Sequence, residues 1–394
     1  MSDFEKLYTE FERTKNVCQF CEDHWENDAA TRFLLIRSLD KDNLKDIIKK
    51  YSTADTKGKF PILTERAYNS SVTIDQLLSY IESQRAPLIR QREAEIEGLE
   101  ELLMDFPIVS CGVRNDNIDD IVKKFVRNKS LKNMDDFYEM LDDYTLLRIR
   151  QYIMWSYYNQ TANDIVELFL LRHPYVIPTL RKIHDIDFFL KLDGKIIPFD
   201  LKFTHISDEY FNLASQGILP NNNPLIHDNF YVADDPESNE LKRIKAYYRD
   251  FRKEHRELGL PKMSGLDKND ICRLLINTGD RDAAQFVHEM KQEHENYVPS
   301  TPDELYKLEW WNYKYQGERL FCNNNRFFVF LSYLHEFVDG RELKGKTAKI
   351  GREITALLDG ITASDIHTVK YHYDKDANRK GDYTALSISA IYYE

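Results

Sequence analysis

The stretch His184–His205, HDIDFFLKLDGKIIPFDLKFTH, constrains the fold of this chain more than any other segment. Asp193-Gly194 lies between two runs of aromatic and branched aliphatic residues. An Asp-Gly pair favours a two-residue type I′ turn, because that turn needs a positive φ at both central positions. The stretch is therefore predicted to form a β-hairpin in which Leu192 faces Lys195.

The predicted register sorts the side chains onto two faces, because successive side chains of a strand point to opposite sides. One face is wholly apolar and must pack on a core: Ile186, Phe188, Leu190, Ile197, Phe199, Leu201 and Phe203. The other face carries the charges: Asp185, Asp187, Phe189, Lys191, Pro198, Asp200, Lys202 and Thr204. In this register Asp187 lies opposite Asp200, and Asp185 lies opposite Lys202.

Two directly opposed aspartates would have Cβ atoms about 4.5–5.5 Å apart, where like charges destabilise a sheet. A bound cation removes this repulsion, and Mg²⁺ accepts one or two carboxylates while keeping several waters. Lys202 on the same face could orient an attacking water or stabilise charge that develops on a phosphate. The alternative is a solvated hairpin face with a cross-strand ion pair between Asp185 and Lys202.

These residues resemble the motif of the PD-(D/E)xK nuclease superfamily, whose fold is that of many type II restriction endonucleases. The motif is an acidic residue that opens one strand, followed by D/E-x-K in the adjoining strand. Asp187 in IDFFL supplies the first acid, and FDLK supplies Asp200 and Lys202. Ile186 stands where the family name has a proline. The resemblance covers approximately residues 157–205.

The family commonly adds a glutamate from the preceding helix, a position that Glu167 in NDIVELFLL fits, with Asp164 as the alternative. The resemblance implies that Asp187, Asp200 and Glu167 bind Mg²⁺, with Mn²⁺ as a possible substitute, and that Lys202 acts in catalysis. Asp185 is the alternative to Asp187 as the first ligand. The implied enzyme is an endonuclease that hydrolyses phosphodiester bonds, most often in DNA although RNA is not excluded, of a restriction or other prokaryotic defence type.

The rest of the chain is predicted to be α/β. Its 394 residues suggest about two to three domains, and 42% hydrophobic residues indicate a folded protein. Residues 1–150 have helical patterning, with a break or kink expected at Pro87, and are assigned to recognition, partner binding or oligomerisation. Strands mix with helices afterwards, so residues 151–394 are predicted to form a restriction-endonuclease-like core, a mixed sheet flanked by helices, with C-terminal elements that contact substrate.

The net charge of −12 argues against a general attraction to nucleic acid. It also suggests that nucleic-acid binding depends on a specific sequence, structure or partner. The protein is accordingly expected to act as a homodimer or with a partner. A local exception is LKRIKAYYRDFRKEHREL, whose aromatic residues lie between basic ones, a pattern suited to phosphates and bases. The predicted nucleic-acid-binding residues are Lys242, Arg243, Lys245, Arg249, Arg252 and Lys253. The alternative is a solvated helix whose acidic neighbours offset these charges.

Two weaker motifs are expected to be structural. GRELKGKT at 340–347 satisfies the P-loop expression through Lys346 and Thr347, but too few residues follow for a nucleotide-binding domain, so a basic surface turn is favoured. Cys18, Cys21 and His24 form half of a zinc motif, for which two free thiols are the favoured interpretation.

The N-terminus has no apolar signal-peptide core, and no apolar run is long enough to span a bilayer. A cytoplasmic protein without a membrane partner is therefore expected. For the chain as a whole, the alternative to an enzyme is a non-catalytic nucleic-acid-binding or protein-interaction module with a degenerate nuclease fold.

Overall fold

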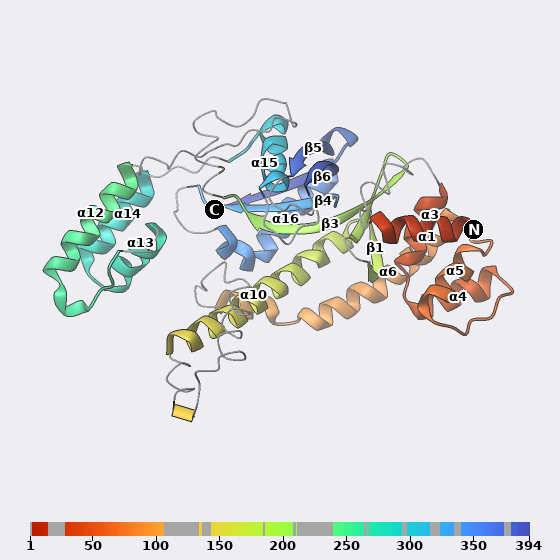
Figure 1. Ribbon diagram of the computed structural model, residues 1–394, viewed down its shortest axis with the longest axis horizontal. Helices are drawn as coiled ribbons and strands as arrows, with labels where there is room; N and C mark the ends of the chain where they lie inside the picture. Colours follow the sequence, from red (N-terminus) through yellow and green to blue (C-terminus); the bar gives the residue numbers. More distant parts are fainter. Residues whose placement is uncertain are drawn as a thin grey trace.

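The fold is a six-stranded mixed sheet flanked by helices, preceded by a helical N-terminal region (Figure 1). The computed structural model describes residues 2–14, 28–105, 134–135, 143–183, 186–207, 210, 239–263, 266, 268–293, 298–315, 324–334, 340–373 and 380–394. The α/β class and the helical N-terminal region are therefore as predicted.

The strand order in the sheet is β1-β2-β3-β4-β6-β5. The strands are β1 Val176–Ile183, β2 Ile186–Leu192, β3 Lys195–His205, β4 Arg326–Ser332, β5 His367–Tyr373 and β6 Gly381–Tyr393. Strands β1, β2 and β3 form an antiparallel meander. Strand β4 is parallel to both β3 and β6, and β5 closes the sheet antiparallel to β6.

The hairpin formed by β2 and β3 has the predicted turn and register. Asp193 has φ 48° and Gly194 has φ 77°, as a type I′ turn requires. Leu192 pairs with Lys195, and the ladder continues in that register to Phe188 and Phe199. Asp187 and Asp200 are the next residues along the two strands, but they lie beyond the last paired residues of the ladder.

The N-terminal region is helical, and it packs as a layer against the first strands. Its helices are α1 Asp3–Thr14, α3 Asp28–Arg37, α4 Lys41–Tyr51, α5 Phe60–Tyr68, α6 Ile74–Ile96 and α7 Leu99–Asp105. The prediction of a break at Pro87 is wrong, because α6 continues through it to Ile96. Packing of α6 against α3, α10 and β1, with Leu77 and Ile81 fully buried, outweighs the backbone hydrogen bond that the proline cannot donate.

The remaining helices surround the sheet or stand beside it. They are α10 Asp143–Arg172, α12 Asn239–Glu254, α13 Lys268–Asn277, α14 Arg281–Glu293, α15 Pro302–Lys314 and α16 Thr347–Gly360, with short 3-10 turns η1 Arg256–Leu258, η2 Gly340–Gly345 and η3 Ala363–Asp365. Helix α10 runs through residue 150, and the division into domains at that point stays a prediction. Helices α12–α14 enclose an apolar core of their own and lie at the opposite end of the molecule from the N-terminal helices (Figure 1).

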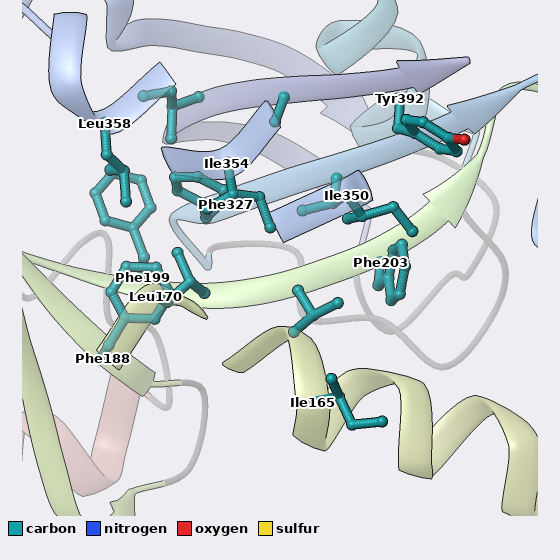
Figure 2. Close-up of a cluster of buried hydrophobic side chains, with 14 of the residues drawn as sticks. Ile165, Leu170, Phe188, Phe199, Phe203, Phe327, Ile350, Ile354, Leu358 and Tyr392 are labelled. Carbon is teal, nitrogen blue, oxygen red and sulfur yellow. The ribbon is translucent and has the colours of Figure 1, made fainter. Parts of the chain in front are cut away.

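The two faces of the sheet are covered differently. On the first, here called the α10 face, Phe188, Phe199 and Phe327 pack with residues of α10 and α16 into the largest core (Figure 2). On the second, here called the α15 face, the N-terminal helices cover β1 and β2 through a core that includes Phe189. Helix α15 covers β4, β5 and β6 on this same face, through an aromatic core that includes Phe328.

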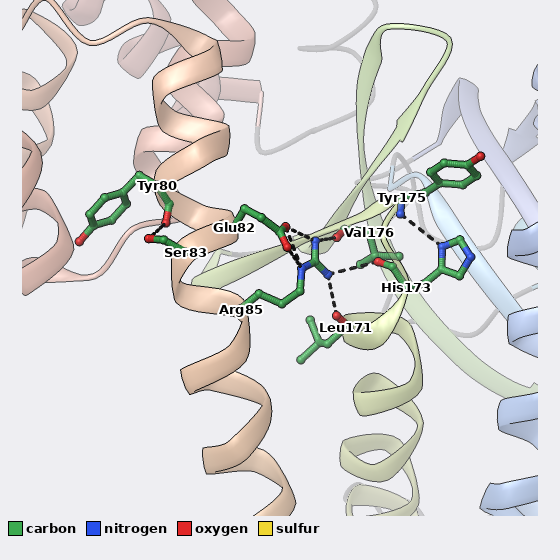
Figure 3. Close-up of polar contacts among 8 residues, drawn as sticks. All are labelled: Tyr80, Glu82, Ser83, Arg85, Leu171, His173, Tyr175 and Val176. Atoms are coloured by element: carbon green, nitrogen blue, oxygen red, sulfur yellow. Dashed lines mark hydrogen bonds and ion pairs between the residues drawn. The ribbon is translucent and has the colours of Figure 1, made fainter.

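A buried arginine fastens the N-terminal helices to the sheet (Figure 3). The guanidinium of Arg85 on α6 donates to the carbonyl oxygens of Leu171 at 2.6 Å, His173 at 3.2 Å and Val176 at 2.6 Å. The last carbonyls of a helix have no partner within the helix, so Arg85 satisfies the carbonyl of Leu171 at the end of α10, while that of His173 also accepts from the backbone N–H of Val176. The turn from α10 into β1 is therefore held in place by the helical region.

Candidate active site

The predicted catalytic side chains occupy the part of the α15 face that lies between its two coverings. Asp187 is the second residue of β2, whose face is covered by the N-terminal helices, and Asp200 and Lys202 lie on β3, the strand next to β4. Asp200 is half-buried and Lys202 is exposed. Phe328, the residue of β4 that pairs with Lys202, is fully buried under α15. The structure therefore leaves the polar end of the hairpin open where the neighbouring strands are covered.

Asp187 is held at the point where β2 and β3 separate. Its Oδ2 accepts a hydrogen bond from the backbone N–H of Leu201 at 2.8 Å, in the place that a backbone carbonyl of β2 would take if the ladder continued. The hydroxyl of Thr179 donates to the backbone carbonyl of Asp187 at 2.7 Å. Leu201 lies between Asp200 and Lys202 in the chain, so this hydrogen bond ties the Asp187 carboxylate to the backbone of the strand segment that carries both.

Asp200 lies near a buried cation. The Nε of Arg326, on β4, is 3.9 Å from Oδ2 of Asp200, and Arg326 is only 2% exposed. The backbone N–H of Asp200 donates to the carbonyl of Asn325 at 2.9 Å, which fixes β3 against β4 at this residue. Asn325 therefore fixes the backbone of Asp200, and Arg326, the first residue of β4, lies beside its carboxylate.

The pKa of Lys202 is lower than that of an ordinary lysine. Protein atoms crowd its ammonium group, and this desolvation, followed by the positive charge of Arg326, lowers its pKa to about 8 although Asp200 acts in the opposite direction. The side chain nevertheless keeps an exposed surface. Crowding together with exposure is typical of a group in a hollow, and among the described residues the ammonium makes no hydrogen bond or ion pair. A lysine of this kind is available to a ligand.

A partly open cavity of about 150 Å³ brings Glu167 and Asp187 together. It is lined by Leu88 and Arg92 of α6, Glu167, Leu170 and Leu171 of α10, Thr179, Leu180 and Arg181 of β1, and Asp187 and Phe188 of β2. Asp164, the alternative to Glu167, is not part of this lining and accepts a hydrogen bond from Gln160 at 2.8 Å. Asp200 and Lys202 are not part of the lining either. Of the four predicted catalytic residues, Glu167 and Asp187 therefore line the cavity, whereas Asp200 and Lys202 lie on β3 outside it.

The acidic residues suit a metal held by few protein ligands. In the described part of the chain, no three Asp, Glu, His or Cys side chains come close enough together to hold a metal ion. Mg²⁺ needs only one or two carboxylates, with waters and substrate phosphates completing its shell. Carboxylates of Glu167 and Asp187 in one cavity fit that requirement, while Asp185 lies outside the described residues.

Several basic side chains of helix α12 form ion pairs with acidic residues of the protein. Arg243 pairs with Glu293 at 2.5 Å, and both Arg249 and Lys253 lie within 3.5 Å of Asp250. Arg252 donates to a backbone carbonyl, and Lys242 is exposed. The binding of phosphates by these residues and Lys245 stays a prediction.

The aromatic residues of α12 belong to the core of the three-helix unit. Tyr247 stacks on Phe286 with ring centroids 3.8 Å apart, Tyr248 is fully buried, and Phe251 is 6% exposed. The contacts favour the solvated amphipathic helix over a base-stacking surface.

The P-loop motif forms ordinary packing contacts. Residues 340–345 form the 3-10 turn η2, and the hydroxyl of Thr347 donates to Glu100 at 3.2 Å. Lys346 lies 3.8 Å from the carboxylate of Glu394, and the ammonium of Lys344 is buried, where it donates to the carbonyl of Phe203 at 2.8 Å. These contacts support a structural segment, but a basic surface turn is the wrong description of it. Cys18, Cys21 and His24 lie outside the described residues.

Two groups of residues escaped the sequence interpretation. Arg92 and Arg181 line the cavity, but no local pattern connects a helix and a strand that lie so far apart in the chain. Glu309, His367 and Ser389 form a buried polar cluster under α15. The sequence did contain a signal for the second group. Glu309 lies between Leu308 and two tryptophans, so it is expected to be buried, and a buried carboxylate needs polar partners.

A scan against protein-family models, a search of curated proteins and a search of solved structures each find nothing that matches this chain. In the described part of the chain, no helix has both the length and the apolar character needed to cross a membrane.

Proposed function

We propose that this protein is a Mg²⁺-dependent endonuclease that hydrolyses phosphodiester bonds in DNA, and that its sheet is a restriction-endonuclease-like core. The observation that carries the proposal is the hydrogen bond that Asp187 accepts from the backbone N–H of Leu201, the residue between Asp200 and Lys202. The mixed sheet with flanking helices and the position of Glu167 beside Asp187 support it.

The residues of the chain take distinct roles in this proposal. Asp187 holds the metal with a second carboxylate, that of Asp200 or of Glu167, and Lys202 positions the attacking water or stabilises the charge that develops on the phosphate. A bound Mg²⁺ would polarise the scissile phosphate and lower the pKa of a bound water. The lowered pKa of Lys202 means that its ammonium gives up a proton more readily than an ordinary lysine. Restriction or another form of prokaryotic defence, in the cytoplasm, is the biological role that we propose, with a homodimer or a partner protein as the active form.

The first test is incubation with plasmid, single-stranded DNA and RNA, each with and without Mg²⁺. We expect Mg²⁺-dependent cleavage that Asp200→Ala and Lys202→Ala each slow by at least about a hundredfold, the cost of removing one preorganised charge from an active site. Lys195→Ala is the matched control, because Lys195 is an exposed lysine on the same strand, next to the hairpin turn. Cleavage that survives Asp200→Ala or Lys202→Ala would contradict the assignment of the site.

A non-catalytic nucleic-acid-binding module is the second candidate. It is favoured by one observation, the lack of a group of three metal-binding side chains in the described part of the chain. The same experiment separates the two candidates, since DNA binding without cleavage of any substrate would support the module.

A further inference from the structure

The cavity beside Asp187 carries charges of both signs. Arg92 on α6 and Arg181 on β1 are among the residues that line it, together with Glu167 and Asp187. Among the described residues, neither arginine lies within ion-pair distance of either acid. Two arginines in one cavity lining are suited to an anionic ligand.

Arg181 is held in a way that leaves its hydrogen-bonding edges available. Its backbone N–H donates to the carbonyl of Ser38 at 2.8 Å, which fixes the strand against α3. Its guanidinium lies over the ring of Phe60, 3.7 Å from the ring centroid. The ring covers the face of the guanidinium, whereas the N–H groups point outward in its plane. In the described part of the chain, this guanidinium makes no hydrogen bond or ion pair.

The surroundings of Arg181 favour an anion. Partial burial, followed by the positive charge of Arg37, lowers the pKa of Arg181, and a bound anion would offset both effects. Arg92 approaches from the other wall, and its ion pair is a long one, 3.6 Å to Glu95 on the same helix. Partly exposed pairs of this kind contribute little energy, so Arg92 can exchange this partner for a ligand.

We propose that Arg92 and Arg181 bind one backbone phosphate of a DNA strand, next to the phosphate that is cleaved. A water occupies about 30 Å³ in the liquid, so a cavity of about 150 Å³ accommodates a phosphate group and some waters. Planar guanidinium groups match the geometry of phosphate oxygens. The two carboxylates disfavour a free phosphate dianion more than a singly charged phosphodiester, and this difference selects a nucleic-acid strand over inorganic phosphate.

The inference rests on the proposed function and adds a role for the N-terminal helices. Arg92 belongs to α6, and Arg85 on the same helix fastens it to the turn between α10 and β1. The fastening places Arg92 at a fixed position relative to Asp187. The helical region is then part of the substrate-binding site.

The test measures binding in EDTA, where cleavage does not interfere. A short fluorescein-labelled DNA duplex is titrated with the full-length protein at several salt concentrations, and affinity is followed by fluorescence anisotropy. We expect Arg92→Gln and Arg181→Gln each to weaken binding about tenfold and to reduce the salt slope by about 1, because each removes one phosphate contact. Arg181→Lys keeps the charge and should keep most of the salt slope.

Arg90→Gln is the matched control, because Arg90 is exposed on α6 and does not line the cavity. Thermal unfolding of each variant confirms that it is folded. The inference is overturned if the wild-type protein does not bind the duplex, if Arg90→Gln weakens binding as much as the cavity variants, or if inorganic phosphate competes as well as unlabelled DNA. The cleavage assay with Lys202→Ala decides the proposed function separately, since it does not depend on these arginines.

Discussion

Two polar clusters lie on the same face of the sheet, and only one of them is closed. Lys202 on β3, Phe328 on β4 and Ser389 on β6 are in register across three adjacent strands. At the β6 end, Ser389 donates to Glu309 of α15, whose other carboxylate oxygen is 2.8 Å from Nδ1 of His367. At the β3 end, Lys202 stays exposed and makes no such contact among the described residues.

The comparison distinguishes polar residues that stabilise the fold from polar residues that are available to a ligand. Glu309 is fully buried, and a buried carboxylate must be paired and hydrogen-bonded to be tolerated, which Ser389 and His367 achieve. The closed cluster therefore has its partners within the protein. The open cluster has a lysine with a lowered pKa, and in the described part of the chain no helix covers it, as expected for a group that binds a ligand.

The largest expected effect is on the free energy of unfolding, and it compares a residue of the closed cluster with a residue of the open one. His367→Leu leaves the buried Glu309 without its imidazole partner and should lower the free energy of unfolding by about 3 kcal/mol. Lys202→Met should change it by no more than about 0.5 kcal/mol, because its side chain is exposed. Urea unfolding of both variants measures the two values. Equal losses would mean that the open cluster is structural as well.

The second prediction concerns pH. The hydrogen bond to Glu309 raises the pKa of His367 in the folded protein, against the effect of burial. A raised folded-state pKa gives stability that is complete below the unfolded value of about 6.5 and is lost as the pH rises through the folded value. We expect unfolding free energy to fall over that interval in the wild-type protein. The slope should be smaller in His367→Leu, and an unchanged slope would assign the effect to other groups.

The smallest expected effect concerns the turn that positions the open cluster. Gly194→Ala should cost about 1 kcal/mol, because φ is 77° and a side chain is strained in the left-handed region even though space is free. Gly360→Ala is the control, since that glycine also has free space but no positive φ. The two unfolding free energies, measured in urea, should differ by about this amount. A neutral Gly194→Ala would show that the turn does not depend on its φ.

The hairpin could be predicted because its determinants are local. The Asp-Gly turn and the alternation of side chains are contained in 22 consecutive residues, and the register follows from them. Helices α15 and α16 and strands β4, β5 and β6 were also evident, because each has a continuous apolar pattern or a cap such as Thr301.

The rest of the site could not be predicted because it depends on distant contacts. Phe189 lies on the charged face by alternation, yet it is fully buried, because the N-terminal helices cover that end of the hairpin. The position of Asp187 depends on where the ladder between β2 and β3 ends, and the pairing of β2 with β1 is irregular at the same place. The cavity arginines come together only when α6 packs on β1.

The register of the hairpin also determines how the site can change. Because a strand has a period of two, inserting one residue into the turn between Asp193 and Gly194 would exchange the two faces of one strand relative to the other. Phe199 would then point toward solvent, and Asp200 would point into the α10 face. Substitutions can alter the chemistry of this site one side chain at a time, but changes in length cannot, so the turn should tolerate replacement far better than insertion or deletion.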